Sequence, residues 1–195
     1  MRPSILLSAL ALLAALPAAV ADARAETGIV RTQGPNADSP IAAAVTVPAG
    51  AETVYLSGAL PAVIDPNAPK GSVQAYGDTQ AQTLSVLSKL KATLEGLGYG
   101  LGDVVQAHVF LAGDPNKGGD IDFAGLQAAW TQYFGTAAQP NKPARSTVKV
   151  AALVLPGALV EIELTAAKVG GGNTDASGLL SNKAGSAPAS SAAAA

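Results

Sequence analysis

The stretch PARSTVKVAALVLPGALVEIELTA at residues 143–166 contains two segments in which side chains of two kinds alternate. In residues 145–150 the two sets are Arg145, Thr147 and Lys149 on one side, and Ser146, Val148 and Val150 on the other. In residues 160–165 the apolar set is Val160, Ile162 and Leu164, and the polar set is Glu161, Glu163 and Thr165. Successive side chains of a β-strand point to opposite faces of its sheet. The stretch therefore predicts two strands with one apolar and one polar face.

Two amphipathic helices are predicted before this stretch. In residues 79–97 leucines recur every three to four positions, and Gly98 follows the last turn. The pattern Thr79-x-x-Gln82 at the start is typical of a capping box. A second helix is predicted over residues 123–134, with Asp122 as its N-cap.

The remaining apolar runs predict the other strands of the sheet. Strands are expected at residues 54–57, 104–111, 146–153 and 159–166. A further strand at Thr46 or Val47 would form a hairpin through the turn at residues 48–50. A sheet with one apolar face covered by two helices is an α+β sandwich.

The polar face of this predicted sheet combines Arg145, Thr147 and Lys149 with Glu161 and Glu163. Such a face is either exposed to solvent or part of an oligomer interface that contains a site. A guanidinium matches a carboxylate as a planar, two-pronged donor, which a lysine does not imitate. The alternative for Arg145 and Glu161 is a cross-strand ion pair with no role in function.

The composition excludes several kinds of chemistry. The chain has 195 residues, of which 49% are hydrophobic and 13% are charged, and it has no cysteine. A disulfide scaffold, a thiolate metal site and a cysteine nucleophile are therefore excluded. The single histidine, His108, disfavours a Ser-His-Asp triad or a multi-histidine metal site and is interpreted as a hydrogen-bonded structural residue. The formal net charge of −2 offers no basic surface for nucleic acid.

Both ends of the chain differ in composition from the segment between them. Residues 1–25 combine a charged start, an apolar run and the small-residue ending Ala23-Arg24-Ala25, which predicts a signal peptide cleaved after Ala25 and a periplasmic or secreted protein. The alternatives are an uncleaved amphipathic anchor and a buried first helix. Residues 170–195 are rich in Gly, Ala and Ser and are predicted to be disordered. The predicted domain is residues 26–169, with no membrane association after cleavage.

Six motifs carry a resemblance to a known family. They are VYLSG at residues 54–58, QTL at 82–84, GYGLGDVV at 98–105, VFL at 109–111, PARS at 143–146 and LPGALVEIE at 155–163. In this order they resemble the Rid family, also called the YjgF/YER057c/UK114 family of enamine/imine deaminases. The resemblance spans roughly residues 42–167.

This resemblance implies a chorismate-mutase-like α+β fold, with a mixed β-sheet, two helices on one face, and a homotrimer with ligand clefts between subunits. It implies that Arg145 grips the substrate carboxylate, that Glu161 positions the attacking water and that Ser57 and Gly58 line the cleft. Thr147 joins this substrate-binding set as the next residue along from Arg145 on the same side of its strand. The implied reaction hydrolyses 2-imino or 2-enamino acids such as 2-aminoacrylate to a 2-keto acid and ammonia, without a cofactor or a metal. The chain would then be a 2-iminobutanoate/2-iminopropanoate deaminase-like hydrolase.

Two departures from the family pattern alter the expected cleft. Ile41 stands where archetypal deaminases have a tyrosine, and Ala59 stands where a glutamine often follows Ser-Gly. Glu163 lies on the same predicted face as Glu161 and could exchange roles with it. The alternative function is therefore a non-catalytic trimer that binds small carboxylates or acts like a chaperone.

Overall fold

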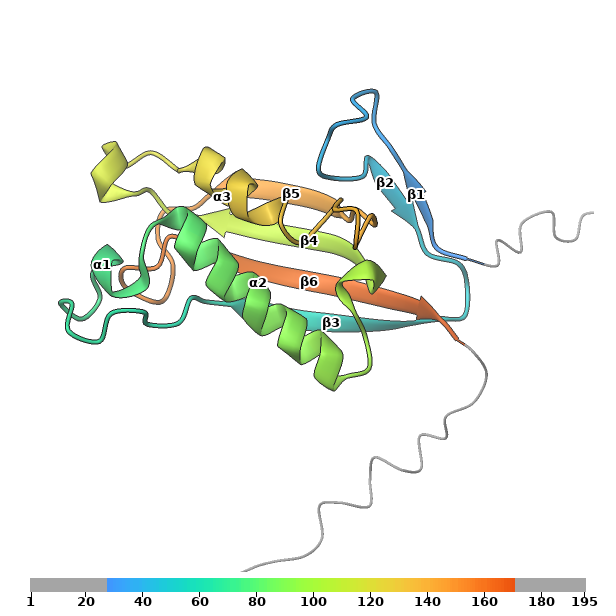
Figure 1. Ribbon diagram of the computed structural model, residues 1–195, viewed down its shortest axis with the longest axis horizontal. Coiled ribbons are helices and arrows are strands. Elements are labelled where there is room, and N and C mark those ends of the chain that lie inside the picture. Colours follow the sequence, from blue (N-terminus) through green and yellow to red (C-terminus); the bar gives the residue numbers. More distant parts are fainter. Residues whose placement is uncertain (1–27, 171–195) are drawn as a thin grey trace, which may run out of the picture.

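The structure is a computed structural model that describes residues 28–170. A four-stranded mixed sheet with the order β3-β6-β4-β5 forms its centre (Figure 1). Its strands are β3 (Ala51–Ala59), β4 (Val104–Leu111), β5 (Ala144–Lys149) and β6 (Val160–Val169). β4 and β5 are parallel, whereas β6 runs antiparallel to both β3 and β4. The predicted signal peptide, and all of the predicted tail except its first residue, lie outside the described residues.

Two helices, α2 (Thr79–Gly96) and α3 (Phe123–Trp130), cover one face of the sheet (Figure 1). The predicted α+β fold is confirmed. The shorter elements are β1 (Val30–Thr32), β2 (Ala44–Thr46), α1 (Val73–Tyr76) and the 3₁₀ turns Leu101–Asp103 and Pro115–Lys117. None of the helices within residues 28–170 is long and apolar enough to span a membrane.

The core lies between the helices and the sheet. It includes residues that are at most 3% exposed from both helices and from the two central strands: Leu87, Leu94, Leu126, Trp130, Val109, Ile162 and Leu164. The leucine periodicity of residues 79–97 is thus the buried stripe of α2, as an amphipathic helix on a sheet requires.

The start of α2 differs from the predicted capping box. The N-cap is Asp78, whose carboxylate accepts a hydrogen bond from the backbone N–H three residues on, at 2.8 Å. Gln82 is instead fully buried and connects α2 to the turn before β6. Its amide nitrogen donates to the Gly157 carbonyl at 3.1 Å, and its oxygen accepts from the Leu159 N–H at 2.7 Å. A buried amide needs such partners. Gln82 therefore connects α2 to the turn before β6 and does not cap the helix.

Three predicted elements have different limits or partners. The second helix ends at Trp130 rather than at residue 134, although Asp122 is its N-cap as predicted. The strand after Arg145 ends at Lys149 rather than at residue 153. The predicted hairpin through residues 48–50 is wrong, because β2 pairs with β1 and not with β3.

The polar residues of β5 do not share a face with Glu161 and Glu163, so this part of the prediction is wrong. The parallel register pairs Arg145 with Ala107 and Thr147 with Val109, and both partners are 1% exposed on the helix-covered side. Glu161 and Glu163 point to the other side, which no helix covers and which we call the open face. At an edge strand the helices cover the sheet only in part, so long polar side chains are accommodated on the helix side. Alternation alone does not say which set faces inward.

Candidate functional site

The guanidinium of Arg145 lies in an aromatic setting beside α3. Its central carbon is 4.5 Å from the ring centroid of Trp130 and 5.9 Å from that of Phe123. Its Nη2 donates a hydrogen bond of 2.6 Å to Oε1 of Gln127. Cation–π stacking and a hydrogen bond from a charged donor hold this planar group in one orientation.

Burial lowers the pKa of Arg145 but leaves the side chain charged at neutral pH. Desolvation lowers the pKa of the guanidinium to about 10, because burial disfavours the charged form. Its Nη1 is buried and has no hydrogen-bond partner among residues 28–170. An unpaired buried donor destabilises a protein by about 1–3 kcal/mol. An anionic ligand that accepts a hydrogen bond from Nη1 would therefore remove this destabilisation.

Helix α3 supplies the side chains that surround Arg145. Phe123, Gln127 and Trp130 are spaced by four and by three residues, which places them on one side of a helix. Asp122 caps this helix by accepting a hydrogen bond of 3.1 Å from a backbone N–H of its first turn. The indole of Trp130 donates to the Pro40 carbonyl at 3.0 Å. The indole ring of Trp130 is therefore held in place by its stacking contact with Arg145 and by its hydrogen bond to Pro40.

Thr147 lies on the same side of β5 as Arg145. It is half-buried, and its hydroxyl oxygen has no hydrogen-bond partner among the described residues. A hydroxyl both donates and accepts. Arg145 and Thr147 thus form a pair of unsatisfied polar groups two residues apart, which is the arrangement expected where a polar ligand binds.

The carboxylate of Glu161 lies on the open face against the backbone of Gly58. The register between β3 and β6 shifts between Leu56 and Ala59, so Gly58 occupies an irregular position in the strand. A Cβ on Gly58 would lie 3.0 Å from Cδ of Glu161 and would collide with its Oε1. Only glycine leaves room for the carboxylate there. Ser57 and Gly58 are exposed beside it, so these three predicted site residues lie together.

Within one chain, the two halves of the predicted site do not meet. Arg145 and Thr147 are on the helix side of the sheet, whereas Ser57, Gly58 and Glu161 are at the open face. No ion pair of the described residues involves Arg145 or Glu161. The cross-strand ion pair considered from the sequence is therefore absent from the described part of the chain.

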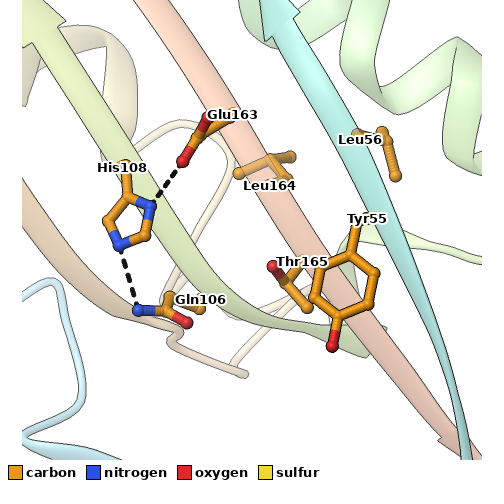
Figure 2. A pocket seen from close by; sticks show the side chains of 7 residues that line it. All are labelled: Tyr55, Leu56, Gln106, His108, Glu163, Leu164 and Thr165. Carbon is orange, nitrogen blue, oxygen red and sulfur yellow. Dashed lines mark hydrogen bonds and ion pairs between the residues drawn. The ribbon is translucent and has the colours of Figure 1, made fainter.

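Glu163 and Glu161 occupy different environments, which separates their roles. Oε1 of Glu163 is 2.6 Å from Nδ1 of His108, and Nε2 of the same imidazole is 3.0 Å from the amide nitrogen of Gln106 (Figure 2). The prediction that His108 is hydrogen-bonded is confirmed. Glu163 is engaged with His108, whereas Glu161 makes no such contact, so Glu161 is the better candidate to position a water.

Comparison with known proteins places the whole described domain in one family. A family model described as endoribonuclease L-PSP matches residues 33–168. A RutC family protein from Pyrococcus horikoshii is 36% identical over 133 residues, which are 68% of this chain and 93% of the relative. A RutC family protein from Pyrococcus abyssi is 36% identical over 115 residues, covering 59% of this chain and 78% of the relative.

The Rid protein YyfB from Yersinia pestis, a protein of unknown function, has a similar crystal structure. The similarity has a TM-score of 0.53 with 26% sequence identity and covers 71% of this chain and 98% of that chain. The chain belongs to the Rid family.

Two features of this Rid chain were not expected from the sequence. One is Gln127, which binds Arg145, although its spacing from Phe123 and Trp130 on one helix side is visible in the sequence. The other is Trp130, which is fully buried and also stacks on Arg145. Ile41 is partly buried against the core of this Rid domain.

Proposed function

We propose that this Rid chain hydrolyses small 2-imino and 2-enamino acids to 2-keto acids and ammonia in a site shared between two copies of the chain. The observation that carries the proposal is the oriented, charged guanidinium of Arg145, whose buried Nη1 lacks a partner among the described residues. A planar donor in this state suits a carboxylate. A 2-imino acid carries that carboxylate next to its reactive C=N bond.

A second copy supplies the water-positioning group in this proposal. Arg145 and Glu161 lie on opposite sides of the sheet in one chain, so one substrate contacts both only if Glu161 comes from a neighbouring copy. Arg145 lies on β5, an edge strand of the sheet, where a neighbour has access. The homotrimer implied by the family resemblance is an arrangement of this kind, because a head-to-tail contact between copies closes into a ring.

The proposed reaction requires that the substrate and a water molecule are held in position and that protons are transferred between them. Arg145 holds the carboxylate, with the Thr147 hydroxyl beside it. Glu161 of the neighbouring copy accepts a proton from a water as the water oxygen bonds to the imine carbon, and the C=N electron pair moves to nitrogen, which takes up a proton. The hydroxyl proton of the tetrahedral intermediate then passes to nitrogen, with the Glu161 carboxylate as the relay, and ammonia leaves as the C–N bond breaks and the C=O bond forms. Positioning and general base catalysis of this kind lower such a barrier substantially.

The proposal is tested by generating 2-imino acids with an amino-acid oxidase and trapping the remaining imine with semicarbazide. We expect the purified chain to reduce the trapped imine and to accelerate keto-acid release, and Arg145→Ala to abolish both effects. A chain that accelerates hydrolysis for none of several amino acids would contradict the proposal, as would full activity of the Arg145→Ala variant.

Binding without turnover is the second candidate, and the departure at Ile41 favours it. The chain has one tryptophan, and this residue, Trp130, stacks on Arg145. Its fluorescence therefore reports on a carboxylate at Arg145. A 2-oxo acid that changes this fluorescence, with no hydrolysis of any imine, would support a binding protein instead of a hydrolase.

A further inference from the structure

Lys149 continues the row of polar side chains that begins with Arg145 and Thr147 on β5. All three residues pair in register with residues of β4 that are each 1% exposed, so all three lie on the helix-covered side of the sheet. The proposed reaction uses Arg145 and Thr147 and gives no role to Lys149. A role for this third side chain would extend the binding site along the edge strand.

The ammonium of Lys149 is held by the β4–α3 loop, which comprises residues 112–122. Its Nζ donates a hydrogen bond of 2.8 Å to the Gly119 carbonyl and lies 3.4 Å from Oδ1 of Asp120. The side chain of Lys149 is 51% exposed and that of Asp120 is 88% exposed. An ion pair this exposed contributes little to stability, and an ammonium has three donors. Lys149 therefore has a defined position and can still bind a carboxylate from solution.

The other two carboxylates of the β4–α3 loop have partners of their own. Asp114 is 2% exposed and accepts a hydrogen bond of 2.8 Å from the Asn116 N–H. Asp122 caps α3 and lies 3.5 Å from Nζ of Lys117. Asp120 is thus the carboxylate of this loop that competes for Lys149. A bound anion would displace only this exposed contact.

The other two members of the row have buried atoms without partners. Nη1 of Arg145 and Oγ1 of Thr147 lack hydrogen bonds among the described residues. The row thus offers a cation, a hydroxyl and a second cation, in that order along one strand. A substrate with one carboxylate uses the first two groups. A substrate with a second carboxylate at its far end would use all three.

The spacing of the row fits a short dicarboxylate. Arg145 and Lys149 are four positions apart, which is roughly 13 Å along a strand. An extended five-carbon dicarboxylate separates its two carboxylate carbons by about 5 Å, and each of these carbons lies about 3–4 Å from the nitrogen that binds it. The two binding nitrogens are then about 12 Å apart. Because both side chains leave the same side of the strand, this length and the backbone spacing are comparable.

We propose that Lys149 selects substrates with a second carboxylate, so that the preferred substrate is the five-carbon 2-imino acid derived from an acidic amino acid. This inference rests on the proposed function, because Arg145 has to hold the carboxylate beside the C=N bond for Lys149 to reach the other one. Nζ of Lys149 binds the far carboxylate in place of Asp120. Lys149 is a specificity-determining residue and takes no part in the bond changes.

The first test compares two ligands that differ only in their terminal group. 2-Oxoglutarate and 2-oxopentanoate share a five-carbon chain and a 2-oxo acid group, and Trp130 fluorescence follows the binding of each to the full chain. We expect 2-oxoglutarate to bind about fivefold more tightly, which is the effect of one half-exposed ion pair. This preference should decrease between about 0.05 M and about 0.5 M salt, because screening weakens exposed pairs.

Two lysine variants separate Lys149 from a general effect of charge. Lys149→Met keeps a long apolar side chain without the charge. In this variant we expect the dissociation constant of 2-oxoglutarate to rise about fivefold and that of 2-oxopentanoate to stay unchanged. Lys91→Met is the matched control, because Lys91 is 47% exposed and also pairs with an exposed carboxylate, that of Glu95. It changes the net charge by the same amount and should keep the preference.

The second test measures the same preference in turnover. Flavin oxidases form the imines of glutamate and of norvaline, which have the same chain length. We expect kcat/KM to be about fivefold higher for the glutamate imine in the unchanged chain, and the two values to be equal in Lys149→Met.

The failures of this inference and of the proposed function can be told apart. Equal affinity of the unchanged chain for the two ligands, or a preference that Lys149→Met retains or that Lys91→Met loses, would overturn the inference and leave the hydrolysis of imines intact. A chain that binds neither ligand would overturn it and would also contradict the role of Arg145. A preference that depends on Lys149, with no hydrolysis of any imine, would support the inferred ligand class and contradict the proposed reaction.

Discussion

Arg145 stacks on Trp130, with the guanidinium carbon 4.5 Å from the indole ring centroid. This contact fixes a cation at the edge of the sheet. It also joins α3 to the PARS segment at residues 143–146. The proposed hydrolysis depends on this geometry, because a mobile arginine would bind a carboxylate without orienting the bond to be hydrolysed.

Replacing Arg145 with lysine tests whether the planar, two-pronged donor geometry of the guanidinium is required. We expect Arg145→Lys to lower kcat/KM for 2-imino acid hydrolysis by roughly 100-fold, similar to the loss of one electrostatic contact in an active site. Lysine keeps the charge but neither stacks as a plane nor donates in parallel to two oxygens. Steady-state kinetics with the oxidase-coupled assay measures this. A variant within a factor of two of the unchanged chain would show that charge alone is sufficient.

Replacing Gln127 tests how Arg145 is oriented. Gln127→Ala removes the 2.6 Å hydrogen bond to Nη2, and a lost bond to a charged donor is worth about 1.5–3 kcal/mol. We expect roughly a tenfold or greater rise in the dissociation constant of a 2-oxo acid, followed by Trp130 fluorescence. Gln127→Glu, which keeps an acceptor but neutralises the guanidinium, should weaken binding as well. Gln132→Ala, on the exposed side after α3, is the control and should leave the constant unchanged.

Replacing Gly58 tests the placement of Glu161. A Cβ at this position would collide with Oε1 of Glu161, so Gly58→Ala should displace the carboxylate and lower kcat more than it raises KM. Gly34→Ala is the matched control, because a Cβ there meets nothing closer than 3.8 Å. Thermal unfolding should show that both variants fold. Unchanged kcat in Gly58→Ala would remove Glu161 from the proposed mechanism.

The pKa of Arg145 predicts how ligand binding responds to alkali. Burial lowers this pKa to about 10, so the charged form that binds a carboxylate is present below pH 10 and is lost as the pH rises through 10. We expect 2-oxo acid binding, followed by Trp130 fluorescence, to be constant between pH 8 and 9 and to weaken by pH 10.5. A carboxylate bound to Arg145 stabilises the charged form and moves the midpoint upward. Binding that does not weaken up to pH 11 would contradict this environment for Arg145.

Much of the fold could be predicted from the sequence because the relevant signals are local. The leucine period of residues 79–97 and the alternation in β6 each define one buried side, and these elements lie where they were expected. The six motifs then supply the fold family. Neither signal depends on knowing which other element packs against the segment.

The face of β5 could not be predicted because it depends on position in the sheet. Arg145 and Val148 follow the alternation expected for a strand, but at an edge strand the helix side admits the arginine and the open face leaves Val148 exposed. Strand order decides this, and it follows from long-range pairing that no local pattern encodes. The sequence does not distinguish Asp78 from Thr79 as the N-cap of α2, because the two are adjacent and both side chains can cap a helix.

The most direct test of the shared site mixes two inactive variants. Arg145→Ala and Glu161→Gln are each expected to be inactive, and the two are combined in equal amounts, dissociated in mild denaturant and reassembled. If Arg145 of one copy and Glu161 of the next form each site, about one quarter of the sites in random rings contain both groups. We therefore predict recovery of about one quarter of the unchanged chain's activity, by that same statistics. No activity in the mixture, when reassembled unchanged chain is fully active, would contradict a site shared between copies.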